Sequence, residues 1–329
     1  MVGRRGKESG SVVEPPRFLI VGPPRSGTTL VQRLASELPG VRVPPETHFF
    51  DHYVAGLLAR RSFPLDRVAL EEELRAYLTI GDLEGLELDT GAVVELLGGT
   101  CSSPLALFAA IVQTLCDGAE VCGEKTPDHL RWWRPLTREL PELRIVAVLR
   151  DPRATVASGR RMPWSSHPHG VLAEAWRLGA QEVARLADGL PPERRLVLRY
   201  EDVVRAPDEA RERIGRLIGV EPREPGELDE PAISSLRLPR EWWKDKVSEP
   251  VSDRWVDRWR EELTEQEALE IALVCRDEME RWGYEADVGA ADGAADRMLA
   301  DLEWQRELWR TWLERKLDEV ADFERRLAR

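Results

Sequence analysis

A loop that can bind an oxyanion spans residues 22–29, where the sequence reads Gly-Pro-Pro-Arg-Ser-Gly-Thr-Thr. The unbroken apolar run 18–21 precedes it, and Leu30, Val31 and Leu34 follow it at helical spacing. A buried strand, a tight glycine loop and a helix N-terminus direct free backbone N–H groups and the positive end of a helix dipole at one anion. We therefore expect a phosphate or sulfate group to bind at this loop.

The loop has the spacing of a Walker A motif but lacks its lysine. Gly22 and Gly27 stand at the motif's two glycine positions, Thr28 replaces the lysine, and Arg25 is the only cation in the loop. A nucleoside triphosphatase needs that lysine on the β- and γ-phosphates and Mg²⁺ on the next hydroxyl. The loop therefore suits a 5′-phosphate better than a metal-bridged triphosphate. A purely structural strand–turn–helix is the alternative for the loop taken alone.

The composition sets the class of protein. A chain of 329 residues is long enough for one large α/β domain with an appendage or for two small domains. Hydrophobic residues make up 42% of the chain and charged residues 33%, which is typical of a soluble globular protein. The formal net charge of −13 argues against a nucleic-acid partner, because phosphate contacts need a basic face.

The cysteines and the N-terminus indicate a cytoplasmic protein. Cys101, Cys116, Cys122 and Cys275 show neither a C-x-x-C pair nor metal-ligand spacing, so we expect free thiols in a reducing compartment. Residues 1–16 are basic, then polar and proline-rich, without the apolar core of a signal peptide, and we expect a disordered leader there. No window is long and apolar enough to predict a membrane span.

Strands alternate with helices from residue 17 to 288, which predicts an α/β domain. We expect a P-loop-like three-layer fold with a mainly parallel central sheet. Residues 52–121 carry a helical pattern without strands, and we expect them to form an insertion that covers the site and selects the substrate. The expected strands are 18–21, 41–43, 120–122, 144–149 and 195–202.

Residues 289–329 form a separate C-terminal segment, in which 298–327 reads as one long amphipathic helix. Trp304, Trp309 and Trp312 are more tryptophans than a solvated helix needs, so we expect it to pack against the core or against a partner subunit. Acidic residues are as frequent as basic ones here, which disfavours a helix lying on a membrane. The expected apolar stripe consists of Leu302, Trp309, Leu313, Leu317, Val320 and Leu327.

Three motifs together resemble the sulfotransferases that use 3′-phosphoadenosine 5′-phosphosulfate. The loop GPPRSGTTL is similar to their 5′-phosphosulfate loop, and VLRDPRATVASG to their 3′-phosphate strand and helix. The segment LRYEDVVRAPDEARERIGRLIGV is similar to the part that closes the nucleotide pocket, which includes Tyr200. The resemblance covers roughly residues 17–285.

This resemblance implies a role for each residue of the loop. Arg25 would lie near the bridging oxygen and stabilise the charge that develops on the leaving phosphate. Ser26, Gly27, Thr28 and Thr29 would donate hydrogen bonds from their backbone and hydroxyl groups. A donor with one 5′-phosphate and one sulfate needs no metal, so no metal is expected.

The resemblance also implies the site of the 3′-phosphate, the group that distinguishes this donor from ATP. Arg150 and Ser158 would hold it, and Tyr200 would contribute to the nucleotide pocket. A surface ion pair between Arg150 and Asp151 is the alternative for that arginine. An ordinary helix position is the alternative for Ser158.

A carboxylate is the expected general base. The segments PETHFFDHY and EKTPDHL resemble parts of the glycosaminoglycan sulfotransferases of the heparan 3-O type, in which a glutamate of E-x-H-F-F acts as base. By this resemblance Glu46 is the base, His48 a substrate contact, and Lys125 a cation that reaches the acceptor or the sulfuryl group. A carboxylate can serve if burial raises its pKa or if the acceptor is held close. The alternatives are a solvated Glu46, a buried structural His48 and a simple Glu124–Lys125 pair.

Other side chains could contribute to the same site. Lys244 and Lys246 occupy the late loop in which the family often places a further 3′-phosphate contact. The tryptophans that could form a ring-stacking wall are Trp132, Trp133, Trp164, Trp242 and Trp243.

The expected activity is transfer of a sulfuryl group from 3′-phosphoadenosine 5′-phosphosulfate to a hydroxyl of a small molecule or glycan, with adenosine 3′,5′-bisphosphate as product. A sugar, a glycolipid or a glycosylated natural product is the expected acceptor. Two alternatives remain open. One is a P-loop kinase for a small molecule with Asp151 as a Walker-B-like carboxylate. The other is a nucleotide-binding assembly protein, not an enzyme, that recruits a partner through its C-terminal helix; the same helix could also join two copies of the chain.

Overall fold

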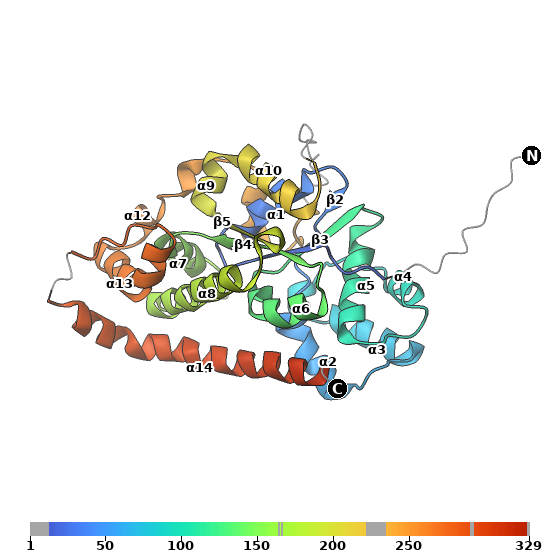
Figure 1. The fold of residues 1–329 in the computed structure, drawn as a ribbon. Helices are drawn as coiled ribbons and strands as arrows, with labels where there is room; N and C mark the ends of the chain where they lie inside the picture. The colour runs from blue at the N-terminus through green and yellow to red at the C-terminus, as the bar shows by residue number, and fades with distance from the viewer. Residues whose placement is uncertain (1–12, 164, 166, 222–234, 290–292, 328–329) are drawn as a thin grey trace, which may run out of the picture.

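The computed structural model describes residues 13–163, 165, 167–221, 235–289 and 293–327. A five-stranded, fully parallel sheet lies at its centre with the strand order β2-β3-β1-β4-β5 (Figure 1). The strands are β1 (Phe18–Val21), β2 (Val41–Arg42), β3 (Val121–Lys125), β4 (Arg144–Leu149) and β5 (Arg195–Arg199).

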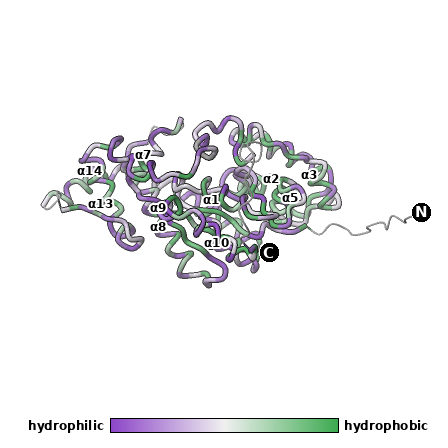
Figure 2. Tube along the Cα trace, turned by 90° about the horizontal axis from the view of Figure 1, so that it is seen from above, coloured by the Kyte–Doolittle hydropathy of each residue, from purple (hydrophilic) through white to green (hydrophobic). Residues whose placement is uncertain are grey.

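Helices cover both faces of the sheet, which is why β1 and residues 145–149 of β4 are apolar without interruption. Alternate residues of β1 serve the two faces: Phe18 and Ile20 pack with α1 and α10, while Leu19 and Val21 pack into the larger cluster beneath α5 to α8. Figure 2 shows hydrophobic segments gathered near the middle of the molecule, around α1 and α8. The covering helices are α1 (Thr28–Ser36), α5 (Pro104–Cys116), α6 (Trp133–Glu139), α7 (Pro152–Arg160), α8 (His169–Gly189), α9 (Tyr200–Arg205) and α10 (Pro207–Ile218).

The segment predicted as a helical insertion is helical. Asp66, Asp89 and Ser103 each accept a hydrogen bond from the backbone N–H three residues later, so three of its helices begin at side-chain caps. Its helices that precede α5 are α2 (Val54–Arg60), α3 (Arg67–Leu78) and α4 (Thr90–Leu96). The short helical elements of the described chain are η1 (Phe49–Tyr53), η2 (Gly81–Leu83), η3 (Pro127–Trp132), η4 (Pro192–Arg194), η5 (Trp242–Ser248), η6 (Asp253–Trp255) and α12 (Trp259–Glu262).

Two strand ends differ from the prediction by more than one residue. β3 continues to Lys125 instead of ending at Cys122, because it keeps pairing with β1 up to the partners Ile20 and Lys125. β5 ends at Arg199, and the next residues begin α9. Glu201 and Asp202 then lie in the first turn of that helix, where negative charge is favourable.

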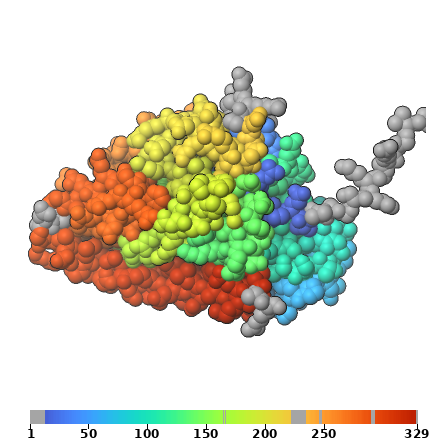
Figure 3. Space-filling model, in the orientation of Figure 1, coloured from blue at the N-terminus to red at the C-terminus, as the bar shows by residue number. Residues whose placement is uncertain are grey.

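The C-terminal helix α14 (Ala295–Leu327) packs along α8 and beside α13 (Glu265–Arg281), as Figure 3 shows. Its contact face buries Leu302, Val320 and Phe323. The predicted stripe is wrong at Leu317, which is 48% exposed, because the contact face is rotated toward Phe323. The helix thus uses its apolar face on its own chain.

The ends of the described chain are anchored. Of the expected leader, residues 1–12 lie outside the described residues. Val13 packs against the core, and the backbone N–H of Glu14 donates to Gln113 at 2.9 Å.

Among the described residues, no helix has the length and apolar character to cross a bilayer. The predicted α/β three-layer fold, with its parallel sheet, helical insertion and long C-terminal helix, is confirmed.

Candidate active site

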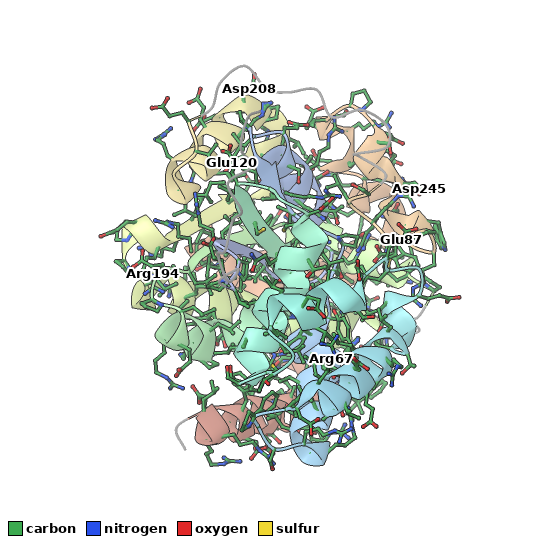
Figure 4. All side chains as sticks on the ribbon, turned by 90° about the vertical axis from the view of Figure 1, so that its right-hand side faces the viewer. Arg67, Glu87, Glu120, Arg194, Asp208 and Asp245 are labelled. Carbon is green, nitrogen blue, oxygen red and sulfur yellow. The ribbon has the colours of Figure 1, made fainter. Side chains whose placement is uncertain are left out.

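A cavity of about 1160 Å³ opens at the carboxyl edge of the sheet. The loop after β1, the residues after β4 and the start of α9 line it, as expected of ligand sites at the carboxyl ends of parallel strands. η5, η6 and residues of the insertion form the opposite wall. Figure 4 shows Asp245 of η5 and Glu87 of the insertion on the same side of the molecule, away from Arg194.

We call one part of this cavity the phosphate-loop end; it comprises residues 23–29, Arg150, Thr155, Ser158 and Tyr200. Gly27 has a φ of 94°, and a Cβ there would lie 2.4 Å from the Tyr200 ring. Only glycine fits against that ring. The ring therefore lies directly on the loop, at the start of α1, where the first backbone N–H groups have no intrahelical partner.

Arg25 projects from the loop through a left-handed backbone, with a φ of 71°. Its Nε donates to Ser158 Oγ at 3.4 Å, which joins the loop to α7. Burial lowers the pKa of Arg25 to about 10, although the nearby charge of Glu46 opposes the shift, so the guanidinium is still charged at neutral pH. The loop cation thus lies within electrostatic reach of Glu46.

Arg150 is held with its guanidinium facing an aromatic ring. Its Cζ lies 4.3 Å from the centroid of Tyr200, and its Nη2 donates to the carbonyl of Trp255 at 2.7 Å. Among the described residues, its buried Nε has no hydrogen-bond partner, and neither has the buried Thr155 Oγ1. Unpaired buried donors beside an aromatic face suit an anion attached to a planar base.

The alternative ion pair between Arg150 and Asp151 is not formed. Asp151 instead pairs with Arg153 at 2.6 Å and accepts from the backbone N–H of that residue at the start of α7. Thr155 was missed in the sequence, although it lies three residues before Ser158 and so on the same face of α7.

One residue of the predicted phosphate loop faces away from the cavity. The side chain of Ser26 is fully buried and does not contribute to the cavity wall, whereas Arg25, Gly27, Thr28 and Thr29 do. The backbone N–H of Ser26 donates to the Pro23 carbonyl at 3.2 Å. Its backbone donor is therefore used within the loop.

We call the other part of the cavity the carboxylate end, because Glu46 lies at its centre. Glu46 Oε1 accepts from the ammonium groups of both Lys125 and Lys244, the second at 2.7 Å. Glu46 Oε2 lies 3.2 Å from His48 Nε2. Burial alone would raise the pKa of Glu46, but the two lysines and His48 outweigh it and hold that pKa well below its ordinary value. Glu46 is thus ionised at neutral pH and is not a solvated carboxylate.

β3 separates the two charges that the sequence places next to each other. Lys125 and Glu124 point to opposite faces of the strand, so they do not pair. Glu124 is fully buried and accepts from Thr126 at 2.6 Å and from His129 at 2.9 Å. Lys125 is also fully buried and lies behind Glu46 instead of in the cavity wall. Burial lowers its pKa to about 8, despite the nearby carboxylate.

Lys244 comes from η5 and lies at the carboxylate end, not beside the predicted 3′-phosphate site. Its Nζ bonds both Glu46 and Glu241. These charges outweigh burial and raise the pKa of Lys244. It lies 198 residues beyond Glu46 in the chain, so no local pattern could have predicted the contact. The side chain of Lys246 lies outside the described residues.

His48 belongs to a chain of hydrogen-bonding groups. Its Nδ1 lies 2.9 Å from Asp51 Oδ2, and its ring stacks on His52 with centroids 4.9 Å apart and planes 9° apart. The charge of Asp51 outweighs burial and raises the pKa of His48 well above its ordinary value. The three side chains offer ligand atoms within 4.8 Å of one another. Two nearly parallel imidazole rings, however, cannot both direct an in-plane nitrogen lone pair at one metal ion. This arrangement therefore suits hydrogen bonding and proton transfer better than metal binding.

The tryptophans of the cavity are mostly not those predicted. Trp132 and Trp133 are buried in the core, and Trp164 lies outside the described residues. The tryptophans that line the cavity are Trp176, Trp242, Trp243, Trp255, Trp259, Trp309 and Trp312.

Comparison with known proteins places the chain among sulfotransferases. A model of the sulfotransferase family matches residues 16–225. The nodulation protein NoeE of Sinorhizobium fredii (strain NBRC 101917 / NGR234) is 30% identical over 325 residues, which cover 89% of this chain and 72% of that protein.

Two solved structures have a similar fold. The sulfotransferase domain of the olefin synthase from Synechococcus PCC 7002 has a TM-score of 0.55 at 20% identity, covering 86% of this chain and 99% of the domain. The sulfotransferase domain of the curacin biosynthetic pathway has a TM-score of 0.55 at 19% identity, covering 83% of this chain and 99% of that domain. At these identities the two structures support the fold alone.

Proposed function

This chain belongs to the sulfotransferase family, whose donor is 3′-phosphoadenosine 5′-phosphosulfate, and we propose that it transfers the sulfuryl group of that donor to a hydroxyl with Glu46 as the base. The observation that carries the proposal is the position of Glu46. It is an ionised, buried carboxylate in the same cavity as the phosphate loop, within electrostatic reach of the loop cation Arg25.

The phosphate-loop end fits the donor. Gly27, Thr28 and Thr29 would hold the 5′-phosphosulfate at the start of α1, and Arg150 with Ser158 would hold the 3′-phosphate. The unpaired Arg150 Nε and Thr155 Oγ1 support this assignment, because bound phosphate oxygens would satisfy both. The donor brings an activated sulfuryl group, and the transfer needs no metal in this proposal.

Glu46 accepts the proton of the acceptor hydroxyl as the acceptor oxygen bonds to sulfur and the bond from sulfur to the bridging oxygen breaks. Its low pKa makes it a weak base in the free protein. A negatively charged sulfuryl group beside Lys244 competes for that cation and adds negative charge near Glu46. Both effects raise the pKa of Glu46 and strengthen it as a base. His48 keeps Oε2 oriented, and Lys125 keeps the carboxylate in place from behind.

Arg25 is the residue that would stabilise charge on the departing bridging oxygen. It lines the cavity at the phosphate-loop end, within electrostatic reach of Glu46, and its guanidinium is charged at neutral pH. We propose a sugar, a glycolipid or a glycosylated natural product as acceptor. We also propose the reducing cytoplasm as the compartment, which the four free cysteines support.

The kinase alternative is not favoured, because the carboxylate of Asp151 is engaged by Arg153.

Calorimetric titration tests the donor assignment. We expect adenosine 3′,5′-bisphosphate to bind in the micromolar range or tighter, and ATP with Mg²⁺ to bind far more weakly. Arg150→Ala should lose about 2 kcal/mol or more of bisphosphate binding. Arg160→Ala is the matched control, because this exposed arginine of α7 pairs with Glu267 of α13, does not line the cavity and should leave binding unchanged.

Glu46→Gln then tests the base. We expect its transfer rate to fall by roughly 10²–10⁴-fold while bisphosphate binding persists. Preferred binding of ATP with Mg²⁺ would instead support a kinase. Full activity of Glu46→Gln would rule out this residue as the base.

A further inference from the structure

The family model matches this chain only up to residue 225, whereas α14 begins 70 residues later, at Ala295. Side chains of α14 nevertheless line the cavity. Trp309 and Trp312 of this helix both line the cavity, with ring centroids 4.5 Å apart and planes inclined by 30°. Trp304 lies on the same helix but is 59% exposed and lies outside the cavity. The helix therefore presents one pair of tryptophans to the site and one single tryptophan to solvent.

Contacts of α14 place this pair at the carboxylate end. Lys316, one turn beyond Trp312, donates to the backbone carbonyl of Asp51 at 3.3 Å. The side chain of Asp51 binds His48, and His48 binds Glu46, so only two side chains separate the Lys316 contact from the proposed base.

A second contact locates Trp312 at the cavity rim. The guanidinium of Arg131 lies 5.1 Å from the Trp312 ring centroid and binds Asp128 at 2.6 Å. Asp128 lines the same cavity. Asp82 also lines the cavity and is held by Arg240 at 2.5 Å and by His52 at 2.9 Å. Asp128 thus lies beside Trp312 through Arg131, and the cavity wall that includes the tryptophan pair also includes Asp82.

The cavity has room for a second molecule beside the donor. Its volume of about 1160 Å³ exceeds the roughly 300–1,000 Å³ of a site for one small ligand. Flat aromatic faces bind the apolar C–H face of a sugar ring, and carboxylates held by arginines accept hydrogen bonds from neighbouring sugar hydroxyls. A phenol or steroid would gain nothing from those carboxylates and would have to desolvate them.

We propose that Trp309 and Trp312 form an acceptor subsite on α14 that binds a sugar ring next to the one being sulfated. This inference rests on the proposed sulfuryl transfer to a sugar and adds the residues that select such an acceptor. The helix is firmly held: the buried Glu174 of α8 binds Arg306 at 3.0 Å, and the backbone N–H of Gly170 donates to Gln305 at 3.0 Å. The subsite is thus preformed.

The test measures sulfuryl transfer from ³⁵S-labelled donor to an array of defined oligosaccharides, with a set of simple phenols in parallel. We expect labelled sugars and unlabelled phenols. For the sugar that is labelled most, the double variant that combines Trp309→Ala and Trp312→Ala should raise the acceptor KM by about tenfold or more. Calorimetric affinity for adenosine 3′,5′-bisphosphate should change less than about twofold. Trp304→Ala, on the same helix, is the matched control and should change neither value.

The outcomes separate this inference from the proposed function. Labelled sugars with an acceptor KM unmoved by the double variant would overturn the subsite alone. Labelled phenols without labelled sugars, or no labelled acceptor despite bisphosphate binding, would overturn the sugar assignment. A wild-type protein that does not bind the bisphosphate would overturn the proposed function and the subsite with it. A double variant that also loses bisphosphate affinity would place the tryptophans at the phosphate-loop end and so contradict the proposal.

Discussion

The phosphate-loop end is assembled mainly from two short stretches, 22–29 and 150–158, whereas the carboxylate end draws on segments that are far apart in sequence. Lys125 and Lys244 lie 79 and 198 residues from Glu46, and both bind the same carboxylate oxygen. The first end depends on backbone shape and steric fit. The second depends on a balance of buried charges. Substitutions at the first should therefore weaken donor binding, and substitutions at the second should slow transfer.

Gly27→Ala should have the largest effect. The added Cβ would lie 2.4 Å from the Tyr200 ring at a φ of 94°, so the loop and the ring cannot both keep their places. We expect bisphosphate affinity, measured by calorimetry, to fall by about 100-fold or more. Gly118→Ala is the control, because Gly118 also has a positive φ of 74° but has nothing within 4 Å of the added Cβ. Equal loss of affinity in both variants would mean that the loss comes from a general disturbance of the fold and not from the contact with Tyr200.

Lys244→Met should separate the two ends most clearly. It removes a cation that faces both Glu46 and the cavity, so we expect kcat to fall by about 10²-fold with little change in bisphosphate affinity. Lys244→Arg should restore part of the rate because it keeps the charge. The opposite pattern, weaker bisphosphate binding with an unchanged kcat, would move Lys244 to the phosphate-loop end.

The pH profile should report Lys125. Its pKa is lowered to about 8 by burial, so its positive charge disappears as pH rises through that value. The neutral amine then no longer holds the Glu46 carboxylate in place, and we expect this loss of position to lower kcat/KM. Lys125→Arg should move this alkaline limb upward by about one pH unit or more, because arginine stays charged. The pKa of Glu46 lies well below its ordinary value, so protonation of this residue should cost the free enzyme no activity near pH 6. An alkaline limb that is identical in both proteins would assign it to another group.

The smallest effect concerns stability. Burial alone would lower the pKa of His129, but the charges of Glu124 and Asp51 outweigh it and raise that pKa to about 9. This stabilisation is fully present below the ordinary pKa of 6.5 and is lost as pH rises through about 9. Between pH 6.5 and 8 the free energy of unfolding should fall by roughly 1–2 kcal/mol, measured in urea. Measurements stop at pH 8 because the lowered pKa of Lys125 makes the opposite contribution above it.

His129→Asn should flatten this dependence on pH, since asparagine does not titrate. If this variant is too unstable to measure, NMR titration of the His129 ring in the wild-type protein gives the pKa directly. A ring that titrates near 6.5 would contradict the prediction.

The two ends also differ in how well the sequence predicts them. The loop with Arg25, Gly27 and Thr28, and the start of the next motif at Arg150, could be located because each follows a strand and its residues are contiguous. Ser26 could not be placed, because the turn that buries its side chain depends on which backbone groups the loop uses internally.

At the carboxylate end the sequence offered Glu46, His48 and Lys125 only through a resemblance. The same resemblance pointed to Lys244 as a 3′-phosphate contact and did not reveal its bond to Glu46, since an irregular loop carries no periodicity that specifies where its side chains point. The register of β3 was equally hidden: its last two residues are charged, and a propensity-based boundary ends before them. Pairing with β1 keeps them in the strand.

That register has a consequence for how this chain can be altered. Glu124 and Lys125 occupy opposite faces of one strand, so a single-residue insertion or deletion in β3 would exchange the carboxylate that binds His129 with the lysine that binds Glu46. The register of this strand therefore determines both the packing of the fold and the composition of the site. The insertion helices and α14 carry no such coupling, because helices can be lengthened or exchanged without reversing a strand. Diversification of substrate range, in nature or in the laboratory, is thereby directed to the helical walls of the cavity and away from the sheet.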